Sequence, residues 1–208
     1  MSEIKLDVRD GLYLSSIDDG DQEALLEHLS TRDVYNTTLN IPFPYTEVDA
    51  HFWIRKRKEI ARTQGIETTF ALRDHDGWMI GIVGADDLQA PLVQSGGTMS
   101  NTNDVPTFRL HRAEIGYWLA PKYWGRGIMT DAVRVYVRFA FESFELARLT
   151  AHVFARNRAS SRVLEKNGFT LEGRLRQHFR KDGELLDAFV YGLLRDEFFR
   201  SVRFLGRS

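Results

Sequence analysis

The pattern of apolar and polar positions predicts that the chain opens with a strand followed by two helices. Residues 12–17 alternate as a strand does, and Asp21 is a suitable N-cap for a helix with apolar spacing over residues 24–29. Thr46 and Asp49 have the spacing of a capping box, so a second helix should begin there, after an extended segment with two prolines. The residues expected on the buried side of that helix are Phe52, Trp53 and Ile60.

Two turn sequences predict β-hairpins in the remainder of the chain. Residues 75–77 read His-Asp-Gly and residues 181–183 read Lys-Asp-Gly, and each turn lies between two β-prone apolar segments. The resulting order β-α-α-β-β-β-α-β-α-β-β predicts an α/β (α+β) fold in which helices cover a mixed sheet. Residues 1–208 form a single domain in this interpretation, with a loop insertion at the aperiodic stretch 89–111. The expected strands after the second helix are 68–73, 78–84, 114–119, 149–154, 174–180 and 185–194, and the expected helices are 131–144 and 159–166.

Composition narrows the classes of function. Lys and Arg total 28 against 29 Asp and Glu, so the formal charge of −1 argues against a nucleic-acid partner. The chain has no cysteine, which excludes disulfides, thiolate metal sites and a cysteine nucleophile, and its six histidines show no metal-ligand spacing. No apolar run is long enough for a membrane helix, and the N-terminus lacks an apolar signal region. We therefore expect a soluble, cytoplasmic protein without a metal or a membrane partner.

The most informative motif is the loop of residues 122–127, Lys-Tyr-Trp-Gly-Arg-Gly, between a predicted strand that ends at Leu119 and a predicted helix. Two glycines let successive backbone N–H groups turn toward one point, and the helix N-terminus adds its positive dipole end, so the loop is suited to an anion. The alternative is an ordinary strand-to-helix turn whose glycines only relieve steric crowding. A nucleotide-binding P-loop is excluded because no Lys-Ser or Lys-Thr follows Gly127, and the dinucleotide fingerprint lacks its third glycine.

Four segments occur in a characteristic order: the strand 114–119, the glycine-containing loop, Asn157 with Ser160 three residues later, and the run 164–169, Leu-Glu-Lys-Asn-Gly-Phe. Together they resemble the GNAT superfamily of acetyl-CoA-dependent N-acetyltransferases, in particular the ribosomal-protein N-terminal acetyltransferases of RimJ and RimL type. The resemblance is strongest over residues 112–195 and looser in the N-terminal part. It implies a mostly antiparallel central sheet, flanked by helices and splayed open at the cofactor groove, with acetyl-CoA as co-substrate.

The resemblance also implies which residues bind the cofactor. The backbone of the loop would hold the pyrophosphate, the strand before it would pair with the amides of the pantetheine arm, and an asparagine amide would hold the arm from the other side. A sheet edge with unpaired N–H and C=O groups suits such amides. Lys122 and Arg126 either reach the phosphates or are solvated surface side chains, and the sequence leaves both interpretations open. The implied residues are Tyr117, Trp118, Leu119, Lys122, Trp124, Gly125, Arg126, Gly127, Ile128 and Asn157.

Two further residues are candidates for the proton transfers. Glu114 is a candidate base for the acceptor amine, directly or through a water; alternatively it orients a neighbour or pairs with an arginine. Many superfamily members place a tyrosine seven residues after the asparagine, where this chain has Leu164. The RimJ/RimL branch implies that Ser160 stabilises the departing thiolate, although Ser160 can also cap the helix that it begins. Because the chain has no cysteine and no evident nucleophile that could carry the acyl group, we expect direct transfer in a ternary complex.

Side chains in the C-terminal hairpin have less definite roles. Arg176, His178 and Arg180 alternate along a strand, so they face either an acidic acceptor or the solvent. Asp187 and Tyr191 either orient the acceptor or form a structural pair.

The predicted function is transfer of an acetyl group to a primary amine, which is a protein or peptide N-terminus or a small-molecule amine. Two alternatives are a transferase that uses a different acyl-CoA and a non-catalytic CoA-binding regulatory module. The sequence does not identify the acceptor, and the resemblance allows a homodimer.

Overall fold

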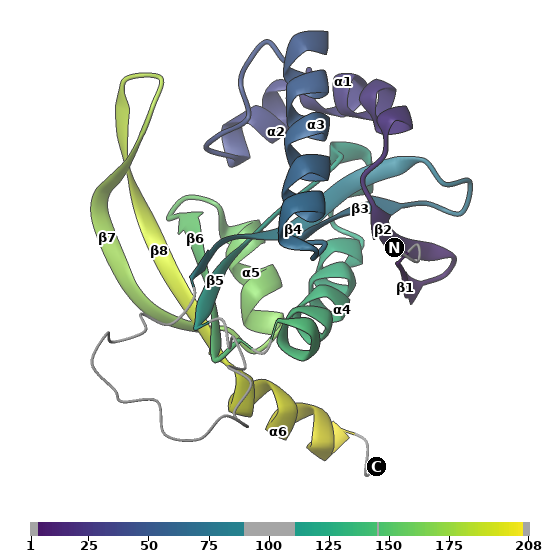
Figure 1. Ribbon diagram of the computed structural model, residues 1–208. Helices are drawn as coiled ribbons and strands as arrows, with labels where there is room; N and C mark the ends of the chain where they lie inside the picture. Colours follow the sequence, from purple (N-terminus) through teal and green to yellow (C-terminus); the bar gives the residue numbers. More distant parts are fainter. Residues whose placement is uncertain (1–3, 90–110, 145, 206–208) are drawn as a thin grey trace, which may run out of the picture.

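The computed structural model describes residues 4–89, 111–144 and 146–205 of the 208 residues. An eight-stranded sheet in the order β1-β2-β3-β4-β5-β6-β8-β7 forms its centre, and helices flank it (Figure 1). Neighbouring strands run antiparallel except β5 and β6, so the expected mixed, mostly antiparallel sheet is confirmed. The strands are β1 (Lys5–Arg9), β2 (Leu12–Ser16), β3 (Thr69–Arg73), β4 (Met79–Gln89), β5 (Arg112–Leu119), β6 (Arg148–Phe154), β7 (Thr170–Lys181) and β8 (Glu184–Leu194). The helices are α1 (Gln22–Leu29), α2 (Arg32–Thr37), α3 (Glu47–Gln64), α4 (Ile128–Ser143), α5 (Arg158–Lys166) and α6 (Arg195–Leu205), with short 3₁₀ turns at Asp19–Asp21 and Pro121–Tyr123.

Side-chain alternation divides the apolar residues of the sheet between two cores. On β3, Phe70 and Leu72 belong to the core that α4 covers, whereas Ala71 between them belongs to the core supplied by α1, α2 and α3. Tyr136 of α4 is fully buried in the first core, where its hydroxyl donates to the carbonyl of Thr68 at 2.8 Å. The central strands are therefore covered on both faces, so packing on each side holds β4 and β5 in place.

Helix α3 begins where the capping box predicts. Thr46 Oγ1 accepts from the backbone N–H of Asp49, and the Asp49 carboxylate accepts from the backbone N–H of Thr46 at 2.9 Å. The burial predicted for Phe52 is wrong, because its side chain is 57% exposed. Ala50 and Ile54 face the core instead. Since successive helical residues are about 100° apart, Phe52 lies on the opposite side of the helix from this stripe.

The sequence pattern does not predict three elements, namely β1, α2 and α6. β1 pairs with β2 across a turn at Asp10 and Gly11, whose φ angles of 47° and 78° are left-handed. α2 is only six residues long. α6 packs Phe198 against Phe141 of α4, with the ring centroids 5.6 Å apart. Each of these elements is short or gains its burial from tertiary contacts, which a local pattern does not contain.

The sheet opens between β5 and β6. Pairing of these two strands is limited to Arg112, Ala113 and Glu114, opposite residues 148–150. Over residues 115–119, β5 pairs with β4 alone among the described strands, so the other edge of this stretch has no described strand beside it. The splay that the resemblance implies is therefore present.

β7 and β8 form a long hairpin that projects from the sheet (Figure 1). Its tip, Asp182 with a φ of 51° and Gly183 with a φ of 82°, is the turn predicted from the Asp-Gly sequence. The Tyr35 hydroxyl of α2 donates to the Asp182 carboxylate, and Lys181 Nζ lies 3.4 Å from the centre of the Tyr35 ring. The hairpin tip is thereby tied to α2.

The loop predicted over residues 89–111 lies almost wholly outside the described residues, since β4 reaches Gln89 and β5 begins at Arg112. The two strands that border it are neighbours in the same sheet.

None of the helices in the described ranges is long and apolar enough to cross a membrane.

Candidate active site

A groove of about 1060 Å³ occupies the opening between β5 and β6. β5 and α3 contribute one part of its lining, and β6 and the start of α5 contribute another. The lining includes Glu114 and Tyr117 from β5, His152 from β6, and Asn157 and Ser160 at the start of α5. The fold thus brings together predicted residues from two separate segments, with a histidine that the sequence analysis did not select.

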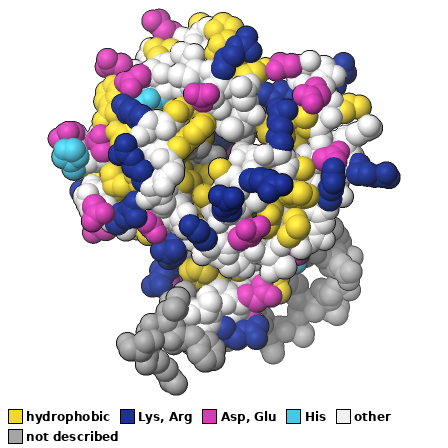
Figure 2. Space-filling view, turned by 180° about the vertical axis from the view of Figure 1, so that it is seen from behind, with side chains coloured by type: hydrophobic (Ala, Val, Ile, Leu, Met, Phe, Trp, Pro, Cys, Tyr) yellow, Lys and Arg dark blue, Asp and Glu magenta, His cyan; other side chains and the backbone are white. Residues whose placement is uncertain are grey.

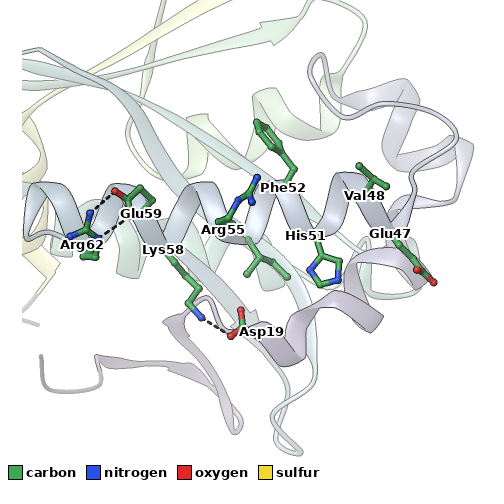
Figure 3. Close-up of a pocket in the computed structure, with 10 residues that line it drawn as sticks. Asp19, Glu47, Val48, His51, Phe52, Arg55, Lys58, Glu59 and Arg62 are labelled. Atoms are coloured by element: carbon green, nitrogen blue, oxygen red, sulfur yellow. Dashed lines mark hydrogen bonds and ion pairs between the residues drawn. The ribbon is translucent and has the colours of Figure 1, made fainter.

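A second hollow lies on the outer face of α3, away from these side chains (Figure 3). Charged side chains border it in two ion pairs: Lys58 with Asp19 and Arg62 with Glu59, each at 2.7 Å. Of the site residues predicted from the sequence, all of which the structure describes, none lines this hollow. The groove between β5 and β6 is therefore the candidate active site.

The loop before α4 presents a cluster of unpaired backbone donors. Gly125 and Gly127 have φ angles of 75° and 77°, a left-handed conformation that other residues adopt only with strain. The N–H groups of residues 125–130 find no acceptor among the described residues, and helical bonding begins with Asp131 N–H donating to the Gly127 carbonyl at 3.2 Å. Because a helix N-terminus carries partial positive charge, this stretch is suited to an anion.

Arg9 of β1 supports the loop. Its Nη2 donates to the carbonyl of Arg126 at 2.5 Å, and its Nη1 lies 2.9 Å from the carboxylate of Asp131 in α4. The same Nη1 would be 3.8 Å from a Cβ placed on Gly127. A strand that the sequence pattern does not predict therefore braces the loop and the first turn of α4.

The two cations of the loop have protein partners. Lys122 Nζ lies 3.1 Å from the carboxylate of Glu27 in α1, and the Arg126 guanidinium lies 5.8 Å from the centre of the Tyr123 ring. Both cations are exposed, and an exposed ion pair holds its partners weakly, so either side chain can turn toward an anion. On the face shown in Figure 2, Lys and Arg are interspersed with Asp and Glu, in agreement with the net charge of −1.

Two tryptophans border the open edge of β5. Trp118 is 9% exposed and meets the ring of His28 edge-on at 6.3 Å. Trp124 is 44% exposed and donates its indole N–H to the carbonyl of Leu119 at 2.7 Å. This bond uses one of the two lone pairs of that carbonyl. The remaining backbone groups at the open edge of residues 115–119 can pair with an extended chain that carries amides.

The start of α5 is capped by Asn157 and not by Ser160. Asn157 Oδ1 accepts from the backbone N–H of Ser160 at 3.1 Å, so the capping role considered for Ser160 is wrong. With its oxygen used in this way, Asn157 offers the groove its Nδ2 donors. Ser160 Oγ instead lies 2.9 Å from the hydroxyl of Tyr117. Leu164, at the position where the superfamily often has a tyrosine, is fully buried in the core.

Glu114 is paired with a histidine. His152 Nδ1 lies 2.9 Å from Glu114 Oε1, and the two side chains are 23% and 39% exposed. In the parallel register, Glu114 pairs with Thr150, and His152 lies two residues further along β6, so their side chains share one face of the sheet. The ring of His178 stacks on that of His152 at 5.4 Å. Sequence spacing does not identify His152 as a site residue, because its contact with Glu114 depends on the β5–β6 register.

A bulge interrupts the alternation predicted for β7. From residue 175 to residue 179, β7 takes four steps while its partner β8 takes two. Gln177 has a φ of 53°, and its backbone N–H donates to Asp187 Oδ1 at 2.8 Å. This N–H and then the Arg174 guanidinium lower the pKa of the Asp187 carboxyl. Asp187 therefore has structural partners, as has Tyr191, whose hydroxyl donates to a glutamate of α5 at 3.0 Å.

The described residues include one cluster of potential metal ligands, formed by Asp74, His75 and Asp76 in the β3–β4 turn. The Asp74 carboxylate already accepts from the backbone N–H groups of Asp76 and Trp78 at 3.1 and 2.9 Å. These bonds shape the turn. None of the three residues lines the groove.

Comparison with known sequences identifies a family. A family model for the acetyltransferase (GNAT) domain matches residues 12–170. An uncharacterized N-acetyltransferase of Bacillus subtilis, YoaA, is 39% identical over 84 residues, which are 40% of this chain and 48% of that protein. The chain spans about half the length of the curated relatives it matches.

Solved structures share the fold. A ribosomal-protein-S5-alanine acetyltransferase from Vibrio fischeri has a TM-score of 0.75 at 19% identity, over 94% of this chain and 98% of that one. A microcin C7 self-immunity acetyltransferase, solved in complex with acetyl-CoA and AMP, has a TM-score of 0.72 at 18% identity, over 90% of this chain and 94% of that one. At sequence identities of 19% and 18%, these structural similarities show a shared fold alone.

Proposed function

The chain belongs to the GNAT acetyltransferase family, and on this premise we propose that it transfers the acetyl group of acetyl-CoA to a primary amine. One observation carries the proposal: the open edge of β5 runs from the carboxylate of Glu114 to a helix N-terminus whose N–H groups at residues 125–130 find no acceptor among the described residues. A long ligand with amides in the middle and phosphates at one end matches both features.

For the donor, we assign the pyrophosphate to the backbone of residues 122–128, with Lys122 and Arg126 as nearby cations. The pantetheine amides pair with the open edge of residues 117–119, and Asn157 Nδ2 donates to the arm from the other side. The microcin C7 acetyltransferase, which has the same fold, is in complex with acetyl-CoA, and this supports coenzyme A as the occupant. The residues assigned to the donor are Tyr117, Trp118, Leu119, Lys122, Trp124, Gly125, Arg126, Gly127, Ile128 and Asn157.

For the reaction, we assign the proton of the acceptor amine to the pair of Glu114 and His152, and the departing thiolate to the hydroxyls of Ser160 and Tyr117. The amine attacks the thioester directly while both substrates are bound, since the chain has no cysteine to carry the acyl group. At pH 7 a lysine side chain costs about 4–5 kcal/mol to deprotonate, whereas an α-amine costs only about 1–1.5 kcal/mol. An α-amine therefore places a smaller demand on the base.

For the acceptor, a protein or peptide N-terminus is the first candidate. The structure from Vibrio fischeri is that of an enzyme named for a ribosomal protein and its alanine, which supports this class. A small-molecule amine is the second candidate. A ribosomal acceptor would place the reaction in the cytoplasm. The homodimer stays a prediction, which sedimentation of the purified chain tests.

The experiment that tests the proposal measures free CoA thiol released from acetyl-CoA across a panel of peptides, amino acids and small amines. Release that depends on one amine class is the expected result, with intersecting double-reciprocal lines because both substrates bind before transfer. Parallel lines would contradict direct transfer. Tight binding of acetyl-CoA without release by any amine would favour a non-catalytic CoA-binding module. Faster release from a longer acyl-CoA would show that the donor is not acetyl-CoA.

A further inference from the structure

The Glu114–His152 pair has the geometry of a base with its orienting group. A carboxylate only accepts hydrogen bonds, so the 2.9 Å contact from Glu114 Oε1 to His152 Nδ1 places the ring hydrogen on Nδ1. A neutral imidazole with Nδ1–H carries its lone pair on Nε2. Among the described residues, His152 Nε2 has no hydrogen-bond partner. Serine-histidine-aspartate triads use the same logic, in which the carboxylate holds Nδ1 and the opposite nitrogen takes the proton.

The β7 bulge fixes the plane of the His152 ring. His178 stacks on it at 5.4 Å with an interplanar angle of 17°, and Phe179 meets its edge at 6.4 Å. Consecutive residues of a regular strand point to opposite faces, so His178 and Phe179 reach the same ring only because the strand is bulged. Within the part of the chain that the structure describes, the titratable groups in contact with the ring are Glu114 from β5 and His178 from β7. β8 places the apolar Val190 opposite His152 in the register.

We infer that His152 is the residue that receives the proton of the acceptor amine, at Nε2, and that Glu114 is the positioning residue that holds its ring. This inference rests on the proposed acetyl transfer. The amine nitrogen attacks the thioester carbonyl carbon, the C–N bond forms and the C–S bond breaks. Sulfur leaves with the bonding electron pair while the amine proton moves to Nε2. The ring then returns its proton to solvent and the thiolate takes one up, so the products are the amide and free CoA thiol.

The test is His152→Asn in the full chain, with His51→Asn as the matched control. The asparagine Nδ2 lies close to the position of Nδ1 and can still donate to Glu114, but no atom replaces Nε2. His51 is an exposed histidine on the outer face of α3 (Figure 3). Amine-dependent CoA release and the KM for acetyl-CoA are measured for both variants and the wild type. His152→Gln replaces His152→Asn if the asparagine variant does not fold.

We expect kcat of His152→Asn to fall roughly 100-fold, the usual contribution of a general base, while the KM for acetyl-CoA changes less than about twofold. His51→Asn should match the wild type. A His152→Asn variant that keeps kcat within about threefold of the wild type would overturn the inference, because a donor to Glu114 would then be sufficient. An equal loss in kcat and in affinity for acetyl-CoA would overturn it as well. If the wild type releases no CoA with any amine, the proposed function itself is contradicted. Because the wild type is measured first, this result is distinguished from a failure of the inference about His152.

Discussion

The hydroxyl oxygens of Tyr117 on β5 and Ser160 at the start of α5 lie 2.9 Å apart in the groove between β5 and β6. The Tyr117 hydroxyl also lies 3.1 Å from the Ser160 carbonyl. Burial raises the pKa of Tyr117, so its hydroxyl stays protonated and can donate. A tyrosine from β5 therefore reaches the start of α5, although the position in α5 where the superfamily often has a tyrosine holds the buried Leu164.

From this pair we predict that Ser160→Ala lowers kcat on the order of 10- to 100-fold, because a hydrogen-bond donor to the leaving thiolate is removed. Tyr117→Phe should lower kcat by a smaller factor, because the Ser160 hydroxyl remains as a donor to the thiolate. The KM for acetyl-CoA should stay nearly unchanged in both. Ser143→Ala, at an exposed position at the end of α4, is the control. An unaltered kcat in Ser160→Ala would remove Ser160 from the mechanism.

The loop geometry predicts a donor-specific effect of Gly127→Ala. An alanine at a φ of 77° costs about 1–2 kcal/mol and would shift the N–H groups that follow. Gly65→Ala is the matched control, because Gly65 has a φ of 67° at the end of α3 and a Cβ placed on it would meet no atom within 4 Å beyond its chain neighbours. Both variants should lose similar stability in thermal unfolding. Only Gly127→Ala should raise the KM for acetyl-CoA; an equal rise in both would contradict the assignment of the loop.

Local signals predict much of the fold. The capping box of Thr46 and Asp49 gives the start of α3, and the Asp-Gly sequence at residues 182–183 gives the β7–β8 turn, because in each case a few adjacent residues determine the backbone. The six-residue α2 has too short a pattern for such a signal, and the exposure of Phe52 depends on which side of α3 meets the sheet.

The site is predicted less completely than the fold. The glycine-containing loop carries its own signal, because left-handed glycines and a helix start are local features. The pairing of His152 with Glu114 depends on a parallel register between strands separated by α4, and the approach of His178 depends on a bulge held by Asp187. Long-range contacts of this kind leave no spacing pattern in the chain.

A buried ion pair predicts a large loss of stability on single substitution. Arg73 and Asp21 are 8% and 3% exposed, and Arg73 Nη1 lies 2.6 Å from Asp21 Oδ1. Arg73→Met leaves the Asp21 carboxylate buried without its main partner, which should cost about 3–5 kcal/mol in urea unfolding. Arg62→Met, which breaks the exposed pair with Glu59, is the control and should leave the unfolding midpoint unchanged. A midpoint for Arg73→Met equal to that of the control would contradict the prediction.

His28 predicts a pH dependence of stability. Burial lowers its pKa from 6.5, with the carboxylate of Glu27 opposing the shift, and its Nε2 lies 3.1 Å from the carbonyl of Met79. As the pH decreases below 6.5, His28 binds a proton in the unfolded chain but not in the folded chain, so the free energy of unfolding decreases. Once the pH is below the lowered pKa of the folded state, both states are protonated and the free energy of unfolding levels off. His28→Gln should flatten this part of the curve, whereas His51→Gln should not. Urea unfolding at a series of pH values from 7 down to about 5 measures the slope.

The most direct measurement follows the acetyl group itself, using acetyl-CoA with an isotopically labelled acetyl group and the best acceptor from the amine and peptide panel. Mass spectrometry counts the labelled amide, and a thiol reagent counts the CoA released. We predict equal amounts of labelled amide and CoA thiol, both dependent on the amine. Acetyl-CoA that binds to the protein while no label reaches any amine or peptide would contradict this prediction.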